Sequence, residues 1–175
     1  MGGFSSAGTS SLAFVKGNQN AVKYIETLEQ YLKPFKAAHY GDKCIFMQDG
    51  ASIHRANVTK KWLKAQEIAV LEWPSRSPDL NPIENVWGRM ARKVYEDSRQ
   101  FDNLDELKEC ILQSWQSLSS TYLSLLVESM PKGCVEVQPL ALFLAYSLLN
   151  FYFSIKRMVQ IVLIASHEYA AKGIF

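Results

Sequence analysis

The stretch that does most to decide the fold is "VLEWPSRSPDLNPIENVWGRM", which spans residues 70–90. It starts as the end of an apolar strand, passes through a loop stiffened by three prolines, and leads into a helix. Asn81 is predicted to be the N-cap of that helix and Pro82 its first residue. Glu84 then falls at the third helical position, where it either completes a capping box or belongs to a site. The buried stripe of the helix is predicted to consist of Ile83, Val86, Trp87, Met90 and Val94.

The segments on the amino-terminal side alternate between strand and helix patterns. Strands are predicted over residues 12–17 ("LAFVKG"), 43–48 ("KCIFMQ") and 68–74 ("IAVLEWP"). Between them lie a helix capped by Asn18 or Asn20 and a second helix over residues 55–66. This alternation favours an α/β layer with parallel strands. Helical spacing predicts apolar faces made of Val22, Ile25, Leu28, Leu32 and Phe35 in the first helix and Val58, Trp62 and Ala65 in the second.

A further helix is predicted on the carboxyl-terminal side, because Asn103 and Glu106 have the spacing of a capping box. We expect this helix to cover the sheet. Its apolar stripe is predicted to consist of Leu104, Leu107, Ile111, Trp115 and Leu118.

The segment "MQDGASIH", residues 47–54, places an acid where the second predicted strand ends. Asp-Gly pairs are strong turn signals, so Asp49 is either a turn residue or part of a site. Glu84 follows after 34 intervening residues, and both acids lie at the carboxyl ends of predicted strands, where α/β proteins usually build sites. Two carboxylates there can bind divalent cations, and two such ions roughly 3.5–4 Å apart would assist phosphodiester displacement.

The composition, with 48% hydrophobic and 21% charged residues, is that of one soluble globular domain. The three cysteines, Cys44, Cys110 and Cys134, lie far apart and form no Cys-x-x-Cys pair. This spacing argues against a zinc site and against a disulfide framework, and it fits a reducing compartment.

The charges are unevenly distributed along the chain. Between Ala51 and Lys93 there are eight basic residues and four acids, whereas between Glu96 and Glu109 there are six acids and two basic residues. A polyanion would approach the first of these regions, although ordinary solvated helix faces also produce such runs. The candidate nucleic-acid contacts are Arg55, Lys61, Arg76, Arg89, Arg92 and Lys93.

Three motifs together resemble the catalytic domain of DNA transposases of the Tc-one/mariner superfamily, in the branch whose last catalytic acid is Glu. They are "FMQDGASIHRA" (residues 46–56), the stretch over residues 70–90, and "LVESMP" (residues 126–131). The resemblance covers roughly Gly2 to Val135. It implies a ribonuclease-H-like α/β fold, in which a mixed sheet is flanked by helices.

The resemblance also implies the chemistry of the site. Asp49 and Glu84 would be catalytic and metal-binding members of an acidic triad that holds Mg²⁺ or Mn²⁺, with His54 and Asn81 near them. The partner would be DNA, which the family cleaves and joins, and no small-molecule substrate is implied. The resemblance further implies that two copies can associate and that the protein acts in the nucleus.

The sequence departs from the family pattern in one important respect. The first acid of the triad belongs upstream of the position of Gly2 and Gly3, and Asp42, the only Asp before Asp49, cannot replace it. We therefore expect an incomplete fold without its first strand, and a chain that does not cut or join DNA. The alternative is a non-catalytic nucleic-acid-binding or interaction module derived from a transposase.

The resemblance divides the chain into a partial catalytic domain over residues 1–135 and an unrelated apolar tail over residues 136–175. From Val137 to Ile155 there are 19 residues without charge, close to the ~20 that cross a bilayer. Gln138 and Asn150 weaken that pattern, so a membrane association is not expected. A translated non-domain tail and an apolar helix packed on the core are the other readings of this segment.

Overall fold

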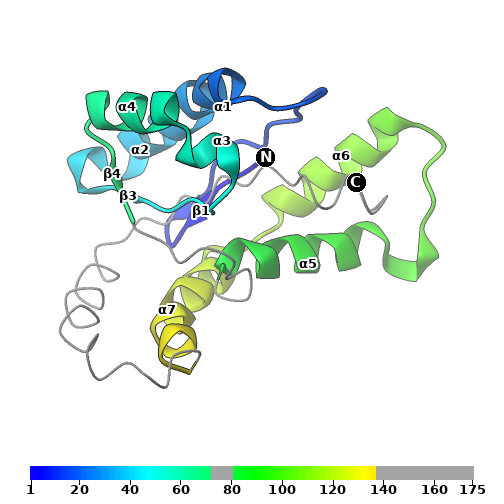
Figure 1. The fold of residues 1–175 in the computed structure, drawn as a ribbon. Helices are drawn as coiled ribbons and strands as arrows, with labels where there is room; N and C mark the ends of the chain where they lie inside the picture. The colour runs from blue at the N-terminus through cyan, green and yellow to red at the C-terminus, as the bar shows by residue number, and fades with distance from the viewer. Residues whose placement is uncertain (72–80, 137–175) are drawn as a thin grey trace.

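The structure, a computed structural model, describes residues 1–71 and 81–136 (Figure 1). Short strands and longer helices alternate along these residues. In chain order the elements are β1 (Phe4–Ser5), β2 (Gly8–Thr9), α1 (Ala21–Thr27), the π-helical turn η1 (Leu28–Leu32), α2 (Lys33–His39), the 3₁₀ turn η2 (Gly41–Lys43), β3 (Ile45–Phe46), α3 (Ser52–Arg55), α4 (Asn57–Ala65), β4 (Ala69–Val70), α5 (Pro82–Val94), the 3₁₀ turn η4 (Glu96–Ser98), α6 (Leu104–Gln116) and α7 (Ser120–Glu136).

The described strands form two small pairs. β1 and β2 are antiparallel, whereas β3 and β4 are parallel, with Phe46 opposite Val70. The predicted parallel pairing of the second and third strands is therefore confirmed. The predicted strand over residues 12–17 is wrong, because only Ala13 pairs there, with Met1, and the chain then turns outward. Phe14, which lies within the predicted strand, is 43% exposed.

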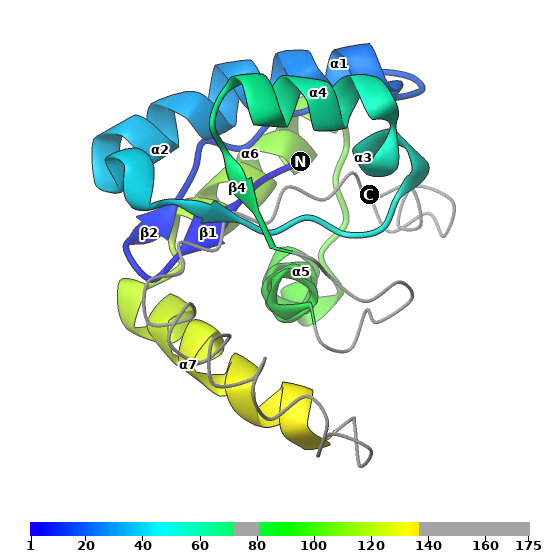
Figure 2. The ribbon, with the colours of Figure 1, turned by 60° about the vertical axis from the view of Figure 1, so that its left-hand side comes forward.

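Strand β3 separates two hydrophobic clusters. Successive side chains of a strand point to opposite faces, so Phe46 packs with α1, η1, α2 and α4, and Met47 packs with α5, α6 and α7. Figures 1 and 2 show α1, α2 and α4 on one side of β3 and β4, and α5 and α7 on the other. The expected architecture of a sheet flanked by helices is confirmed.

The helix that runs from α1 through η1 to α2 begins after Asn20, whose Oδ1 accepts a hydrogen bond from Lys23 N at 2.9 Å. The predicted apolar face is correct at Leu28, Leu32 and Phe35 but wrong at Val22, which is 56% exposed. Tyr24 takes its place, because the buried stripe follows i, i+4 spacing from position 24 through η1.

The predicted face of α4 is wrong at Val58, which is 47% exposed. Thr59 and Leu63 are buried instead. A polar side chain can be buried at position 59 because its hydroxyl donates a hydrogen bond to Ile53 O at 2.7 Å.

Helix α5 begins at Pro82 as predicted, and all five residues of its predicted stripe are buried. Helix α6 begins after Asn103, whose Oδ1 accepts from Asp105 N and Glu106 N, so the predicted cap is confirmed. The Glu106 carboxylate accepts from Asp102 N rather than from Asn103 N. Leu104 is 65% exposed, and its assignment to the buried stripe is wrong because it precedes the first packed turn.

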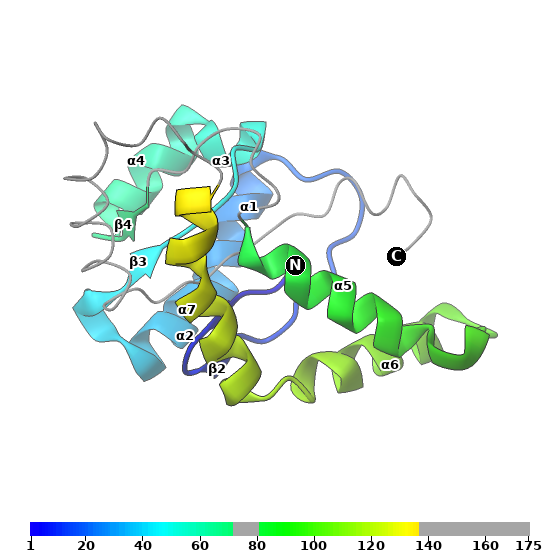
Figure 3. The same ribbon diagram turned by 90° about the horizontal axis from the view of Figure 1, so that it is seen from below.

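Helix α6 packs on α5 rather than across the sheet, and Figure 3 shows the two helices side by side. The rings of Trp87 and Trp115 stack with centroids 5.3 Å apart. Trp115 Nε1 also donates to Ser10 O at 2.7 Å, which connects α6 to the β1–β2 segment. Among the described residues, the expectation that α6 covers the sheet is met at Trp115, through this hydrogen bond.

Helix α7 contributes Leu123, Val127 and Met130 to the cluster that contains Met47. The predicted strand end at Pro74 and the apolar tail beyond Glu136 lie outside the described residues. Among residues 1–71 and 81–136, no helix combines the length and the apolar character that a bilayer crossing requires.

Candidate active site

Asp49 lies two residues beyond Met47, at the carboxyl end of β3. Its Oδ1 accepts a hydrogen bond from Ala51 N at 2.9 Å, the local contact that defines an Asx turn. The turn interpretation of the Asp-Gly pair is therefore correct as far as it goes. The side chain remains 31% exposed, so it is also accessible at this edge.

The same carboxylate oxygen has a second donor. His54 Nδ1 lies 2.5 Å from Asp49 Oδ1. The imidazole is fully buried, and its ring centroid lies 4.2 Å from that of Tyr24. Residues 49 and 54 are thus joined across the short loop between β3 and α3, and the loop is held against α1 by the ring contact.

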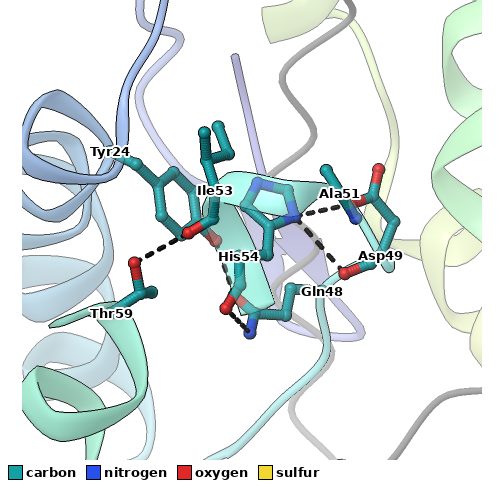
Figure 4. Close-up of polar contacts among 7 residues, drawn as sticks. All are labelled: Tyr24, Gln48, Asp49, Ala51, Ile53, His54 and Thr59. Atoms are coloured by element: carbon teal, nitrogen blue, oxygen red, sulfur yellow. Dashed lines mark hydrogen bonds and ion pairs between the residues drawn. The ribbon is translucent and has the colours of Figure 1, made fainter. Parts of the chain in front are cut away.

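Two further side chains, Tyr24 and Gln48, hold this arrangement in place (Figure 4). The Tyr24 hydroxyl donates to Gln48 Oε1 at 2.8 Å, and Gln48 Nε2 donates to the main-chain oxygen of His54 at 3.4 Å. The sequence reasoning missed both residues. Gln48, a polar side chain inside an apolar strand and next to Asp49, was a usable signal, whereas nothing in the local pattern marked Tyr24.

The environment keeps Asp49 ionised. Burial raises the pKa of its carboxyl group, but the hydrogen bond and charge interaction with His54 and the hydrogen bond from Ala51 N outweigh it, so the pKa is lowered overall. Burial, together with the negative charge of Asp49, raises the pKa of Tyr24 well above its usual range. Tyr24 therefore remains protonated and can donate to Gln48.

The second predicted acid, Glu84, occupies the third position of α5. Asn81, 3% exposed, is the N-cap by position, but its side chain makes no capping hydrogen bond; Glu84 N instead bonds Asn81 O at 3.0 Å. The Asn81 side chain therefore does not supply its part of the predicted capping box. Ile83, the neighbour of Glu84, belongs to the same core cluster as Met47, so one cluster supports the segments that carry both acids.

The described residues contain no group of three or more His, Cys, Asp or Glu side chains arranged to hold a metal ion. If Asp49 and Glu84 alone bound an ion, water would complete its coordination. The joint use of Asp49 and Glu84 as ligands stays a prediction.

The candidate DNA-binding residues lie on two separate surfaces. Arg55 and Lys61 are exposed on the α3–α4 side, whereas the other described candidates belong to α5, across β3 from them. On α5, Arg89 lies 4.4 Å from the centroid of the Tyr122 ring, and Lys93 donates to Ser117 Oγ at 2.6 Å. Arg92 is exposed, and Arg76 lies outside the described residues.

Comparison with known proteins agrees with this geometry. A family described as DDE superfamily endonuclease matches residues 1–108. The transposable element Tc3 transposase of Caenorhabditis elegans is 38% identical over 137 residues, which are 78% of this chain and 41% of that protein. The Tcb1 transposase of Caenorhabditis briggsae is 31% identical over 136 residues, which are 78% of this chain and 49% of that protein. The chain thus spans less than half the length of these relatives.

Solved structures show the same fold. The Mos1 transposase catalytic domain with raltegravir and Mn has a TM-score of 0.65 at 20% identity, over 73% of this chain and 66% of that one. The Mos1 mariner transposase catalytic domain has a TM-score of 0.63 at 20% identity, over 73% of this chain and 65% of that one. The predicted ribonuclease-H-like fold is confirmed. The match over residues 1–108 shows that the chain belongs to the DDE superfamily of endonucleases, and its sequence is similar to those of the Tc3 and Tcb1 transposases.

Proposed function

We propose that this chain contributes Asp49 and Glu84 as metal ligands to a transposase active site that acts on DNA phosphodiester bonds. The observation that carries the proposal is the state of Asp49. Its carboxylate lies at the end of β3, is kept ionised, and has one oxygen fixed by Ala51 N and His54 Nδ1. A carboxylate oriented in this way at a strand end is suited to a hard divalent cation.

The donor set fits Mg²⁺ or Mn²⁺. Both cations prefer oxygen ligands, and both candidate ligands are carboxylates on elements supported by one core cluster. The structural neighbours from Mos1 were solved with Mn and with Mg. When bound, such ions lower the pKa of a nucleophilic water and stabilise the charge on the leaving oxygen. The part played by Asp49 is to present an ionised, oriented oxygen.

DNA is the partner that the proposal implies, and the nucleus is the compartment in which a genomic DNA substrate would be found. Exposed basic side chains lie on both sides of the β3–β4 pair, at Arg55 and Lys61 and at Arg89 and Arg92. Contacts of this kind with phosphates give binding that is independent of sequence and weakens as salt rises. Association of two copies remains an expectation from the family resemblance.

The proposal is tested by incubating supercoiled plasmid with the chain in Mg²⁺ and in Mn²⁺. Asp49→Ala and Glu84→Ala are compared with Asp42→Ala, whose side chain is fully exposed and makes only a 3.9 Å ion pair with Lys36. Nicking that the first two substitutions abolish and the third retains would establish the site. If all four proteins nick the plasmid only at the same background level but still bind DNA, the result would instead favour the non-catalytic binding module and the inactivity expected from the sequence.

A further inference from the structure

The two oxygens of the Asp49 carboxylate are in different situations. Oδ1 accepts from both Ala51 N and His54 Nδ1, at 2.9 and 2.5 Å. Within residues 1–71 and 81–136, the structure gives no hydrogen bond to Oδ2. Figure 4 shows this second oxygen directed away from the imidazole ring. The hydrogen bonds therefore fix the rotation of the carboxylate and leave one particular oxygen outward.

We propose that His54 is a positioning residue, which holds Asp49 so that Oδ2 alone serves as a metal ligand. The inference rests on the proposed function, because it assumes that Asp49 binds a divalent cation. It adds that Asp49 coordinates the cation through one carboxylate oxygen, and that the buried His54 determines which of the two oxygens this is. Tyr24 and Gln48 support the same role, because Tyr24 packs on the imidazole ring and Gln48 donates to the main-chain oxygen of His54.

The histidine itself has little freedom to move. Its ring packs on Tyr24, its main-chain oxygen accepts from Gln48, and the neighbouring Ile53 O accepts from the Thr59 hydroxyl. Its Nε2 is buried and has no hydrogen-bond partner among the described residues. The contact with Asp49 is thus the one polar interaction that the ring makes there, which is why the ring orientation and the carboxylate orientation depend on each other.

Removing a group that orients a metal ligand typically lowers metal affinity by about 10- to 100-fold. A purely structural histidine would give a different result, because its loss would lower stability without a specific effect on the metal. The two roles are separated by a pair of amides. Asparagine places its Nδ2 donor near the position of the histidine Nδ1, whereas glutamine places its donor near that of Nε2. Both lose the ring contact with Tyr24 equally.

The experiment measures Mn²⁺ affinity of the full chain by electron paramagnetic resonance, which counts free Mn²⁺ in solution. The parent is compared with His54→Asn, His54→Gln and Asp49→Asn. His39→Ala is the matched control, because His39 is an exposed histidine that also contacts an aromatic ring, that of Phe35, at 4.7 Å. Thermal unfolding of each protein is recorded in parallel.

We expect His54→Asn to bind Mn²⁺ within about 3-fold of the parent and His54→Gln to bind about 10- to 100-fold more weakly, at similar unfolding temperatures. His39→Ala should match the parent. If His54→Gln binds like the parent while Asp49→Asn does not bind, the positioning role is overturned and the proposed function stands. If His54→Asn and His54→Gln weaken binding equally, the positioning role is also overturned. If Asp49→Asn binds as well as the parent, or the parent does not bind, both proposals fail.

Discussion

The hydroxyl of Tyr24 provides the most informative single-atom test of how the site is held. In Tyr24→Phe, the 2.8 Å hydrogen bond to Gln48 Oε1 is lost, and both residues lie in the buried interior. A buried acceptor left without its donor costs about 1–3 kcal/mol. For a chain of this size, each kcal/mol shifts the unfolding midpoint by about 2–4 °C, so we expect a decrease of roughly 2–12 °C.

The matched control is Tyr122→Phe. The Tyr122 hydroxyl also donates one hydrogen bond, in this case to the main-chain oxygen of Asn85, but at 3.3 Å and exposed to solvent. Its loss should change stability by no more than about 0.5 kcal/mol. The assay is thermal unfolding followed by circular dichroism, with both variants and the parent measured together. If Tyr24→Phe unfolds within the error of Tyr122→Phe, the hydrogen-bonded connection from α1 to the end of β3 is not what holds the site.

Four other substitutions test separate parts of the structure by the same unfolding assay. Asn103→Ala removes the acceptor of two amides at the start of α6 and should cost about 1 kcal/mol; an unchanged midpoint would refute the cap. Gly2→Ala would bring a Cβ to 2.7 Å from Leu12 Cδ1 and 2.9 Å from Trp115 Cζ2, so we expect the free energy of unfolding to fall by about 1–3 kcal/mol. In Gly88→Ala, within α5, the new Cβ meets nothing within 4 Å, so we expect the free energy of unfolding to rise by roughly 0.5–1 kcal/mol. Folding lowers the pKa of Asp49. Its ionised form therefore stabilises the folded protein at pH values above the unfolded-state pKa of about 3.9. This contribution is lost as the pH falls through the pKa that Asp49 has in the folded protein. The stability difference between the parent and Asp49→Asn should therefore shrink below about pH 4, and a difference that grows there would contradict the sign.

Local sequence rules succeeded where one element decides the outcome. Asn81, Pro82 and the stripe from Ile83 to Val94 are predicted by helix-start preferences and helical spacing, and the helix begins and packs accordingly. The same rules failed at Val22 and Val58, because the choice of buried face there depends on neighbouring elements. At position 59 a threonine is buried since Ile53 O satisfies its hydroxyl, which composition alone does not reveal.

The site was only partly predictable for the same reason. Asp49 and His54 lie five residues apart, and their contact follows from a local loop. Tyr24 reaches Gln48 across 24 residues, through the packing of α1 on β3, and no pattern of spacing encodes that contact. From the sequence, Asp49 is either a turn residue or a site residue. The structure shows that its turn hydrogen bond and its contact with His54 use the same oxygen, so the two descriptions are compatible.

The most direct test of the central claim is to locate the metal. Crystals of the chain soaked in Mn²⁺ would be measured at a wavelength where Mn scatters anomalously. We expect a peak at about 2.0–2.3 Å from Asp49 Oδ2, with the carboxyl groups of Asp49 and Glu84 within roughly 8 Å of each other. A peak on Oδ1 would contradict the role given to His54. Carboxyl groups farther apart than that, or no peak beside Asp49, would contradict the assignment of this pair as the metal-binding site.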